Sequence, residues 1–75
     1  MFNISLTVIA KNDGMAISNI TNALTSIKVN IVSIVNTTTR DGEAKIDLVV
    51  QVKDRQQEKG IKVKLKSLSD VYDVK

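Results

Sequence analysis

The sequence predicts a small α+β domain in which strands and helices form two packed layers. Two stretches, Phe2–Ala10 and Ala44–Val52, alternate apolar and polar residues as half-buried strands do. Between them, apolar residues from Ala16 to Ile27 recur with the period of an amphipathic helix. Asp41-Gly42, which lies between two apolar stretches, is a strong hairpin signal. A chain of 75 residues has room for one such domain.

The amino-acid composition argues against several classes of protein function. The chain has no histidine and no cysteine, so the usual general base, the thiolate metal ligands and disulfides are all missing. The net charge of +3 is only mildly basic. No apolar run reaches the ~18–20 residues of a membrane span, and the alternating N-terminus does not resemble a signal peptide. We therefore expect a cytoplasmic, non-catalytic domain with no cofactor, no metal and no membrane contact.

The first strand ends at Ala10, and a polar segment, Lys11-Asn12-Asp13-Gly14, interrupts the pattern. Either Asn12 or Asp13 is a suitable N-cap for the helix that follows, because their side chains accept hydrogen bonds from first-turn N–H groups. The apolar stripe of that helix consists of Ala16, Ile17, Ile20, Ala23, Leu24 and Ile27. Its other face is polar but uncharged, so we expect tertiary packing to hold the helix in place.

A second extended stretch, Ile31–Thr39, is rich in β-branched residues. If Asp41-Gly42 is a two-residue turn, Arg40 lies opposite Glu43 and the remaining pairs follow by counting. The predicted core-side pairs are then Val35 with Leu48 and Ile31 with Val52.

The segment from Asp54 to Leu68 is read as a second helix, because Ile61, Leu65 and Leu68 have helical spacing. Alternation over Ile61–Leu65 also allows a strand there. A short last strand, Val71–Lys75, completes the order β-α-β-β-α-β. Right-handed crossovers then give a two-layer, ferredoxin-like sandwich with a four-stranded antiparallel sheet and two helices on one face.

Two positions suggest ligand binding rather than catalysis. Gly14 lets the backbone approach a ligand closely, and the first-turn N–H groups around Met15 and Ala16 can receive a carboxylate. Asn30 offers both a donor and an acceptor. Ordinary structural roles stay open at this point, with Gly14 as a turn residue and Asn30 as a left-handed residue that ends the helix.

Together these residues resemble the ACT domain, a ferredoxin-like regulatory module, over nearly the whole chain. The resemblance is carried by Ile4–Ala10, Gly14-Met15, Ile20-Thr21, Asn30-Ile31, Val32-Ser33-Ile34, and Leu65, Leu68, Val71 and Val74 at three-residue steps. Thr37-Thr38-Thr39, Asp41-Gly42 and Leu68–Val74 look most like the C-terminal ACT domain of RelA/SpoT-type proteins, which make and hydrolyse (p)ppGpp. Departures lie in the loop, where Lys11 and Asn12 replace that family's Asp-Arg, and Met15 and Ala16 replace its Leu-Leu.

The resemblance implies a fragment of a larger enzyme, a GTP pyrophosphokinase, that senses an amino acid or a partner and signals to catalytic domains outside this chain. It also implies ligand binding between two such domains. The ligand-binding residues that the resemblance implies are Gly14 and Asn30. Their neighbours Asn12, Asp13, Met15, Ala16 and Ile31 are weaker candidates for ligand contact. The alternatives are an amino-acid-binding domain of a metabolic enzyme and a protein- or ribosome-interaction module without a small-molecule ligand. Asp13 favours the last, because its carboxylate repels an incoming one.

The predicted sheet also suggests a surface for self-association. The counted register puts Val32, Ile34 and Val49 on the open face of the sheet, with Ile9 beside them, and puts the second strand at an edge. We therefore expect a homodimer. RNA binding through aromatic platforms is excluded, because Phe2 and Tyr72 are the only aromatic residues. The basic patch Lys59, Lys62 and Lys66 is expected to be a solvated helix face, with ribosome or RNA contact made through the parent.

Overall fold

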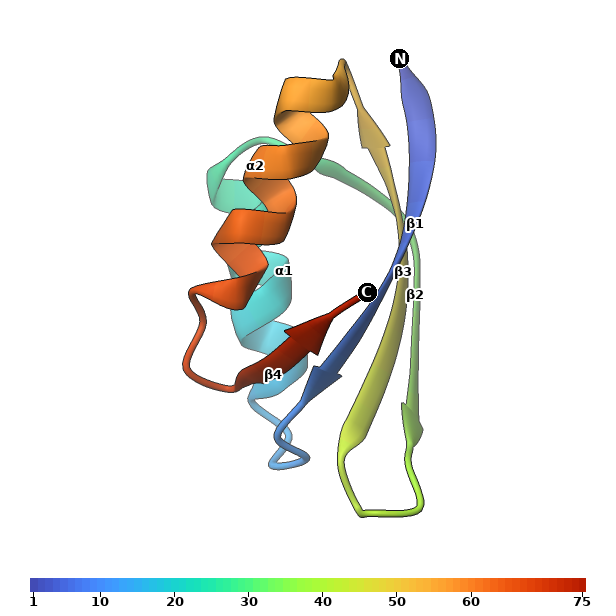
Figure 1. Ribbon diagram of the computed structural model, residues 1–75, viewed down its shortest axis with the longest axis vertical. Coiled ribbons are helices and arrows are strands. Elements are labelled where there is room, and N and C mark those ends of the chain that lie inside the picture. The colour runs from blue at the N-terminus through green and yellow to red at the C-terminus, as the bar shows by residue number, and fades with distance from the viewer.

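The computed structural model describes residues 1–75 and contains four strands and two helices (Figure 1). In chain order they are β1 (Phe2–Ala10), α1 (Ala16–Ser26), β2 (Asn30–Thr38), β3 (Ala44–Val52), α2 (Arg55–Lys66) and β4 (Val71–Val74). The predicted order is confirmed, and the segment that the sequence allows as helix or strand is the helix α2. No helix combines the length and the apolar character needed to cross a membrane.

The four strands form one antiparallel sheet in the order β2-β3-β1-β4. Both helices lie on the same face of this sheet and leave the other face open (Figure 1). This is the predicted ferredoxin-like sandwich, and β2 occupies an edge as expected. At the other edge the short β4 pairs only with the second half of β1, from Thr7 onward.

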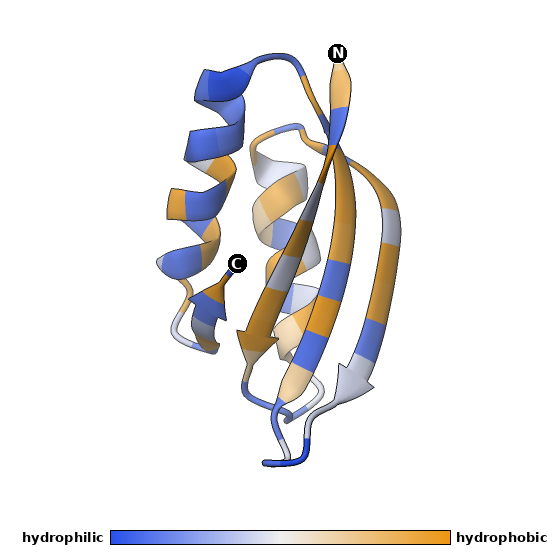
Figure 2. Ribbon diagram, turned by 45° about the vertical axis from the view of Figure 1, so that its right-hand side comes forward, coloured by the Kyte–Doolittle hydropathy of each residue, from blue (hydrophilic) through white to orange (hydrophobic).

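The core rests on the central pair of strands. β1 and β3 pair without interruption from Phe2↔Val52 to Ala10↔Ala44, so their even-numbered side chains share the helix-covered face. Ile20 and Leu24 of α1 and Ile61 and Leu65 of α2 are fully buried against that face. Figure 2 shows this alternation along β1 and β3, where hydrophobic segments in orange follow hydrophilic or pale ones. No polar or charged residue is buried.

α2 begins at a well-formed cap. The Asp54 side chain accepts a hydrogen bond from the backbone N–H of Gln57 (2.8 Å), and the Gln57 side chain accepts one from the N–H of Lys53 (2.7 Å). This reciprocal pair resembles a capping box: it satisfies the Gln57 N–H, which the helix geometry leaves free, and the Lys53 N–H just before the cap. The cap explains why Gln57 is polar at a position where an apolar residue would otherwise add to the core.

The predicted hairpin register is wrong by one residue. Thr39 N donates to Glu43 O (2.8 Å) and Gly42 N donates to Thr39 O (3.1 Å), so the loop has three residues rather than two. A two-residue type I′ turn needs positive φ at both central residues, and here only Gly42 (φ +80°) adopts it. Arg40 therefore does not lie opposite Glu43.

The register shift turns the side chains of β2 to the other face. Val35 lies opposite Asp47 instead of Leu48, and Ile34 takes the place opposite Leu48. A β-bulge between Ile31 and Ser33 then moves Ile31 opposite Val50 instead of Val52.

The predicted open-face patch is consequently corrected. Ile34 lies on the helix-side face, opposite Leu48, and is 37% exposed. Val32 lies in the bulge and is 52% exposed. Ile9 and Val49 lie on the open face as expected, and both are half-buried among polar neighbours.

Both ends of α1 differ from expectation. The N-cap residue is Met15, with no side-chain cap, rather than Asn12 or Asp13. At the other end Lys28 is the left-handed residue (φ +60°), not Asn30, which already belongs to β2. The N–H groups of Lys28 and Val29 donate to the carbonyls of Thr25 and Leu24, the Schellman pattern that usually uses glycine.

Lys28→Gly is therefore expected to stabilise the domain by about 1 kcal/mol, because glycine adopts positive φ without steric cost. Urea denaturation measures the change. Lys62→Gly is the matched control: within α2 the same replacement is expected to destabilise by about 1 kcal/mol. Destabilisation by both variants would contradict the assignment of strain to Lys28.

Candidate functional site

The loop between β1 and α1 is held by its own backbone and by the segment before β4. Lys11 N donates to Asp70 O (2.8 Å), which fixes the start of the loop. Asp13 Oδ1 accepts a hydrogen bond from Met15 N (3.0 Å), and Asp13 Oδ2 lies 3.9 Å from Lys11 Nζ. Gly14 has φ +80°, a conformation that side chains with a Cβ adopt only with strain. The glycine is therefore required by the turn, whatever else it does.

The first turn of α1 presents free backbone donors beside this loop. Its first hydrogen bond runs from Asn19 N to Met15 O (2.9 Å), so the N–H groups of Ala16, Ile17 and Ser18 precede the helical ladder. Such groups attract anions, although the Asp13 carboxylate already accepts from Met15. Met15 itself is 57% exposed, whereas Ala16 is buried and contributes only backbone to this surface.

Asn30 lies at the beginning of β2, exposed at the edge of the sheet. Its backbone pairs with Gln51, and its side-chain amide makes no hydrogen bond within the chain. The next residue, Ile31, is half-buried against the core. The amide of Asn30 is thus available to a ligand or to another chain.

A single chain does not bring Gly14 and Asn30 together. The loop lies at one end of α1 and Asn30 follows the other end (Figure 1). An α-helix of 11 residues is about 16 Å long at 1.5 Å per residue, which exceeds the span of one amino acid. Asn12, Asp13, Met15 and Ala16 gather at the Gly14 end, and Ile31 lies at the Asn30 end. The isolated chain contains no pocket.

The surface that joins these two ends is almost free of charge. Lys28 is the only charged residue between Asp13 and Arg40, a stretch that contains all of α1 and all of β2. Depletion of charge is typical of the buried centre of protein interfaces. β2 is also an edge strand, so its outward N–H and C=O groups are unpaired.

The outward groups of β2 follow from its hydrogen bonds to β3. Thr39 pairs with Glu43 through its N–H, and hydrogen-bonded positions alternate along antiparallel strands. Thr37 and Val35 therefore point their backbone groups toward β3, while Thr38, Asn36 and Ile34 point theirs away from the sheet. This run of alternate free groups is regular up to the bulge at Val32.

Two residues near the loop escape prediction from the sequence. Asn19 Nδ2 donates to Asp70 Oδ2 (2.6 Å), which ties α1 to the turn before β4. No local pattern identifies a contact between residues 51 positions apart. Asp70 thus places a second carboxylate against the first half of α1. No three acidic side chains of the chain lie close enough together to hold a metal ion.

The fold and this loop define the class: a ferredoxin-like domain with a glycine turn at the start of its first helix and an uncharged edge. The model of the ACT domain family matches residues 1–75, so the chain belongs to the ACT domain family. ACT domains are regulatory, non-catalytic modules, and they generally bind small-molecule effectors and dimerise. A comparison with curated protein sequences gives no match.

Solved structures agree on the fold. The crystal structure of the ACT domain from GTP pyrophosphokinase of Chlorobium tepidum has a TM-score of 0.82 and 22% identity, covering 99% of this chain and 95% of that one. The small subunit of acetolactate synthase from Thermotoga maritima has a TM-score of 0.87 and 18% identity, covering 100% and 47%. A homoserine dehydrogenase from Thiobacillus denitrificans has a TM-score of 0.76 and 20% identity, covering 97% and 16%. At these identities the likeness concerns the fold alone.

Gly14→Ala is expected to destabilise the domain by about 1–2 kcal/mol, because the added Cβ meets no neighbour but disfavours φ +80°. Gly60→Ala is the matched control, since Gly60 also has open space but lies within α2 with ordinary helical φ. That change is expected to stabilise by about 0.5–1 kcal/mol. Thermal or urea unfolding distinguishes the two, and equal signs would contradict the role given to Gly14.

Proposed function

We propose that this chain is the regulatory ACT domain of a GTP pyrophosphokinase in the cytoplasm, and that it senses an amino acid where two copies meet. The observation that carries the proposal is the position of Gly14 and Asn30 at opposite ends of one surface whose only charged residue is Lys28. An amino acid carries an anionic and a cationic group, and the free N–H groups of α1 and the Asn30 amide match these needs. In the proposal the chain is part of a larger enzyme and signals to catalytic domains outside it.

A second copy completes the site if two β2 strands pair antiparallel. Pairing centred on Asn36 sets Ile34 of each copy opposite Thr38 of the other, which uses all three outward positions before the bulge. The antiparallel direction carries Asn30 of the second copy toward the hairpin end of the sheet. That end is where Thr38, Ala44 and Ala10 lie in one row and where the Gly14 loop leaves β1. The Asn30 amide of one chain and the Gly14 loop of the other then lie at the same end of the interface between the two copies.

Two observations support a GTP pyrophosphokinase as the parent enzyme. The Chlorobium ACT domain resembles this chain over nearly the full length of both. The sequence also carries Ile20-Thr21, Asn30-Ile31 and a threonine run at the places that the RelA/SpoT resemblance requires. An amino-acid-binding ACT domain of a metabolic enzyme is the alternative parent, in line with the acetolactate synthase and homoserine dehydrogenase structures.

A second candidate function is an interaction module that binds a protein and no small molecule. The hydrogen bond from Met15 N to Asp13 Oδ1 favours it, because one donor of the loop is already satisfied. The Asp13 and Asp70 carboxylates also oppose the carboxylate of an incoming amino acid. A titration of the chain with amino acids distinguishes this interaction module from the amino-acid sensor.

We expect a titration with the twenty amino acids to shift the amide NMR signals of Gly14, Met15, Asn30 and Ile31 with one of them. Asn30→Ala is then expected to weaken binding about 2- to 13-fold, the value of one hydrogen bond of about 0.5–1.5 kcal/mol. Asn22→Ala removes an exposed amide elsewhere on α1 and is the control, with affinity unchanged. A dispersed spectrum that none of the twenty changes would sink the ligand proposal and leave the interaction module.

A further inference from the structure

The net positive charge of the molecule resides on α2, a different element from those that form the proposed ligand surface. α2 carries five basic residues and one acidic residue, a net charge of +4, whereas the whole chain carries +3. The remaining 63 residues therefore have a net charge of −1. The basic residues are Arg55, Lys59, Lys62, Lys64 and Lys66.

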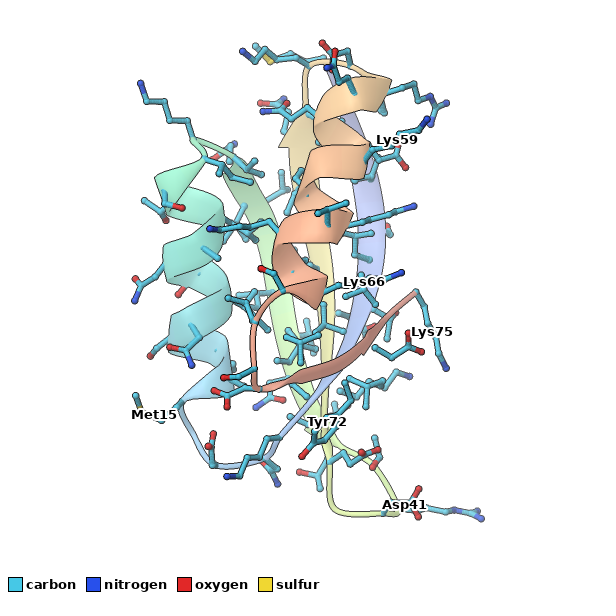
Figure 3. The ribbon with its side chains drawn as sticks, turned by 60° about the vertical axis from the view of Figure 1, so that its left-hand side comes forward. Met15, Asp41, Lys59, Lys66, Tyr72 and Lys75 are labelled. Atoms are coloured by element: carbon cyan, nitrogen blue, oxygen red, sulfur yellow. The ribbon has the colours of Figure 1, made fainter.

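Four of these five side chains form one row. Arg55, Lys59, Lys62 and Lys66 follow the spacing i, i+4, i+7 and i+11, which puts them on one face of a helix. The row is about 16 Å long at 1.5 Å per residue. Glu58 interacts with Arg55 (2.9 Å) and Lys62 (3.7 Å), while Lys59 and Lys66 make no ion pair. In Figure 3, Lys59 and Lys66 project from the same side of α2.

We propose that this row binds the phosphate backbone of a nucleic acid strand. One strand of a duplex carries a phosphate every ~3.4 Å of axis, so the row faces about four or five phosphates. Arginine and lysine contacts of this kind fix position without reading sequence, which suits a helix that itself has no aromatic residue. The only aromatic ring beside the row, that of Phe2, is covered by the Arg55 guanidinium at 5.1 Å. The inference does not depend on the proposed amino-acid site, because it uses a different element.

Two other occupants fit the row less well. A helix that lies on a membrane inserts its apolar face, but Ile61 and Leu65 are fully buried in the core and unavailable. An acidic protein partner needs apolar anchors at the centre of its interface. Val63 is the only large exposed apolar side chain on α2.

Fluorescence anisotropy with a labelled 20-nucleotide poly(U) RNA tests the proposal. The full chain is expected to bind weakly, with Kd in the non-specific range of ~10⁻⁴–10⁻⁶ M, and to lose affinity as salt rises. Lys59→Gln combined with Lys66→Gln is expected to lower the slope of log K against log salt by about 1.4, or ~0.7 for each lost contact. Both positions are exposed and glutamine is a good helix former, so the fold is retained.

Arg40→Gln combined with Lys45→Gln removes the same charge from the hairpin and β3, and this control is expected to keep the slope. An equal decrease of the salt slope in the two double variants would overturn the proposal, because it would show an effect of net charge alone. Poly-glutamate that displaces the RNA at equal charge concentration would also overturn it, in favour of an acidic polypeptide. Absence of binding at 50 mM salt would overturn it outright.

Discussion

The antiparallel pairing of β1 with β3 is the constraint on which the rest of the molecule depends. Its unbroken register from Phe2↔Val52 to Ala10↔Ala44 puts one apolar row of each strand on the same face. Both helices depend on packing on that face, because α1 is poor in strong helix formers and helices of 11 and 12 residues are marginal in isolation. The turn at Gly14 and the Schellman pattern at Lys28 then fix where α1 begins and ends, and thus where the loop and Asn30 lie.

Packing around this pair divides the surface into two halves of different character. α1 and β2 form a half with a single charged residue, Lys28, whereas α2 carries more net positive charge than the whole chain. A half without charge is suited to contact with another protein surface, and a half with clustered charge is suited to solvent or to a polyanion. The two proposed binding functions are therefore physically compatible in one small domain.

The sequence was sufficient for the fold class, the six elements and nearly all of the core, because apolar periodicity follows burial directly. It was not sufficient for the hairpin, since Asp41-Gly42 fits both two- and three-residue loops and only hydrogen bonding distinguishes them. Lys28 at positive φ was also hidden, because its neighbours Leu24 and Val29 impose the conformation. Of the candidate site, the loop and Asn30 are predictions from the sequence, whereas the Asn19–Asp70 contact has no local sequence signal.

The most direct test of the account is an isotope-filtered NOE experiment on a mixture of ¹³C,¹⁵N-labelled and unlabelled chains. Such a spectrum contains only contacts between copies, so it distinguishes a site shared by two chains from one within a chain. We expect contacts between Asn30 of one copy and the loop Asn12–Gly14 of the other, together with contacts across Asn36. A dimer whose contacts exclude β2, or a chain that stays monomeric at NMR concentrations, would contradict it.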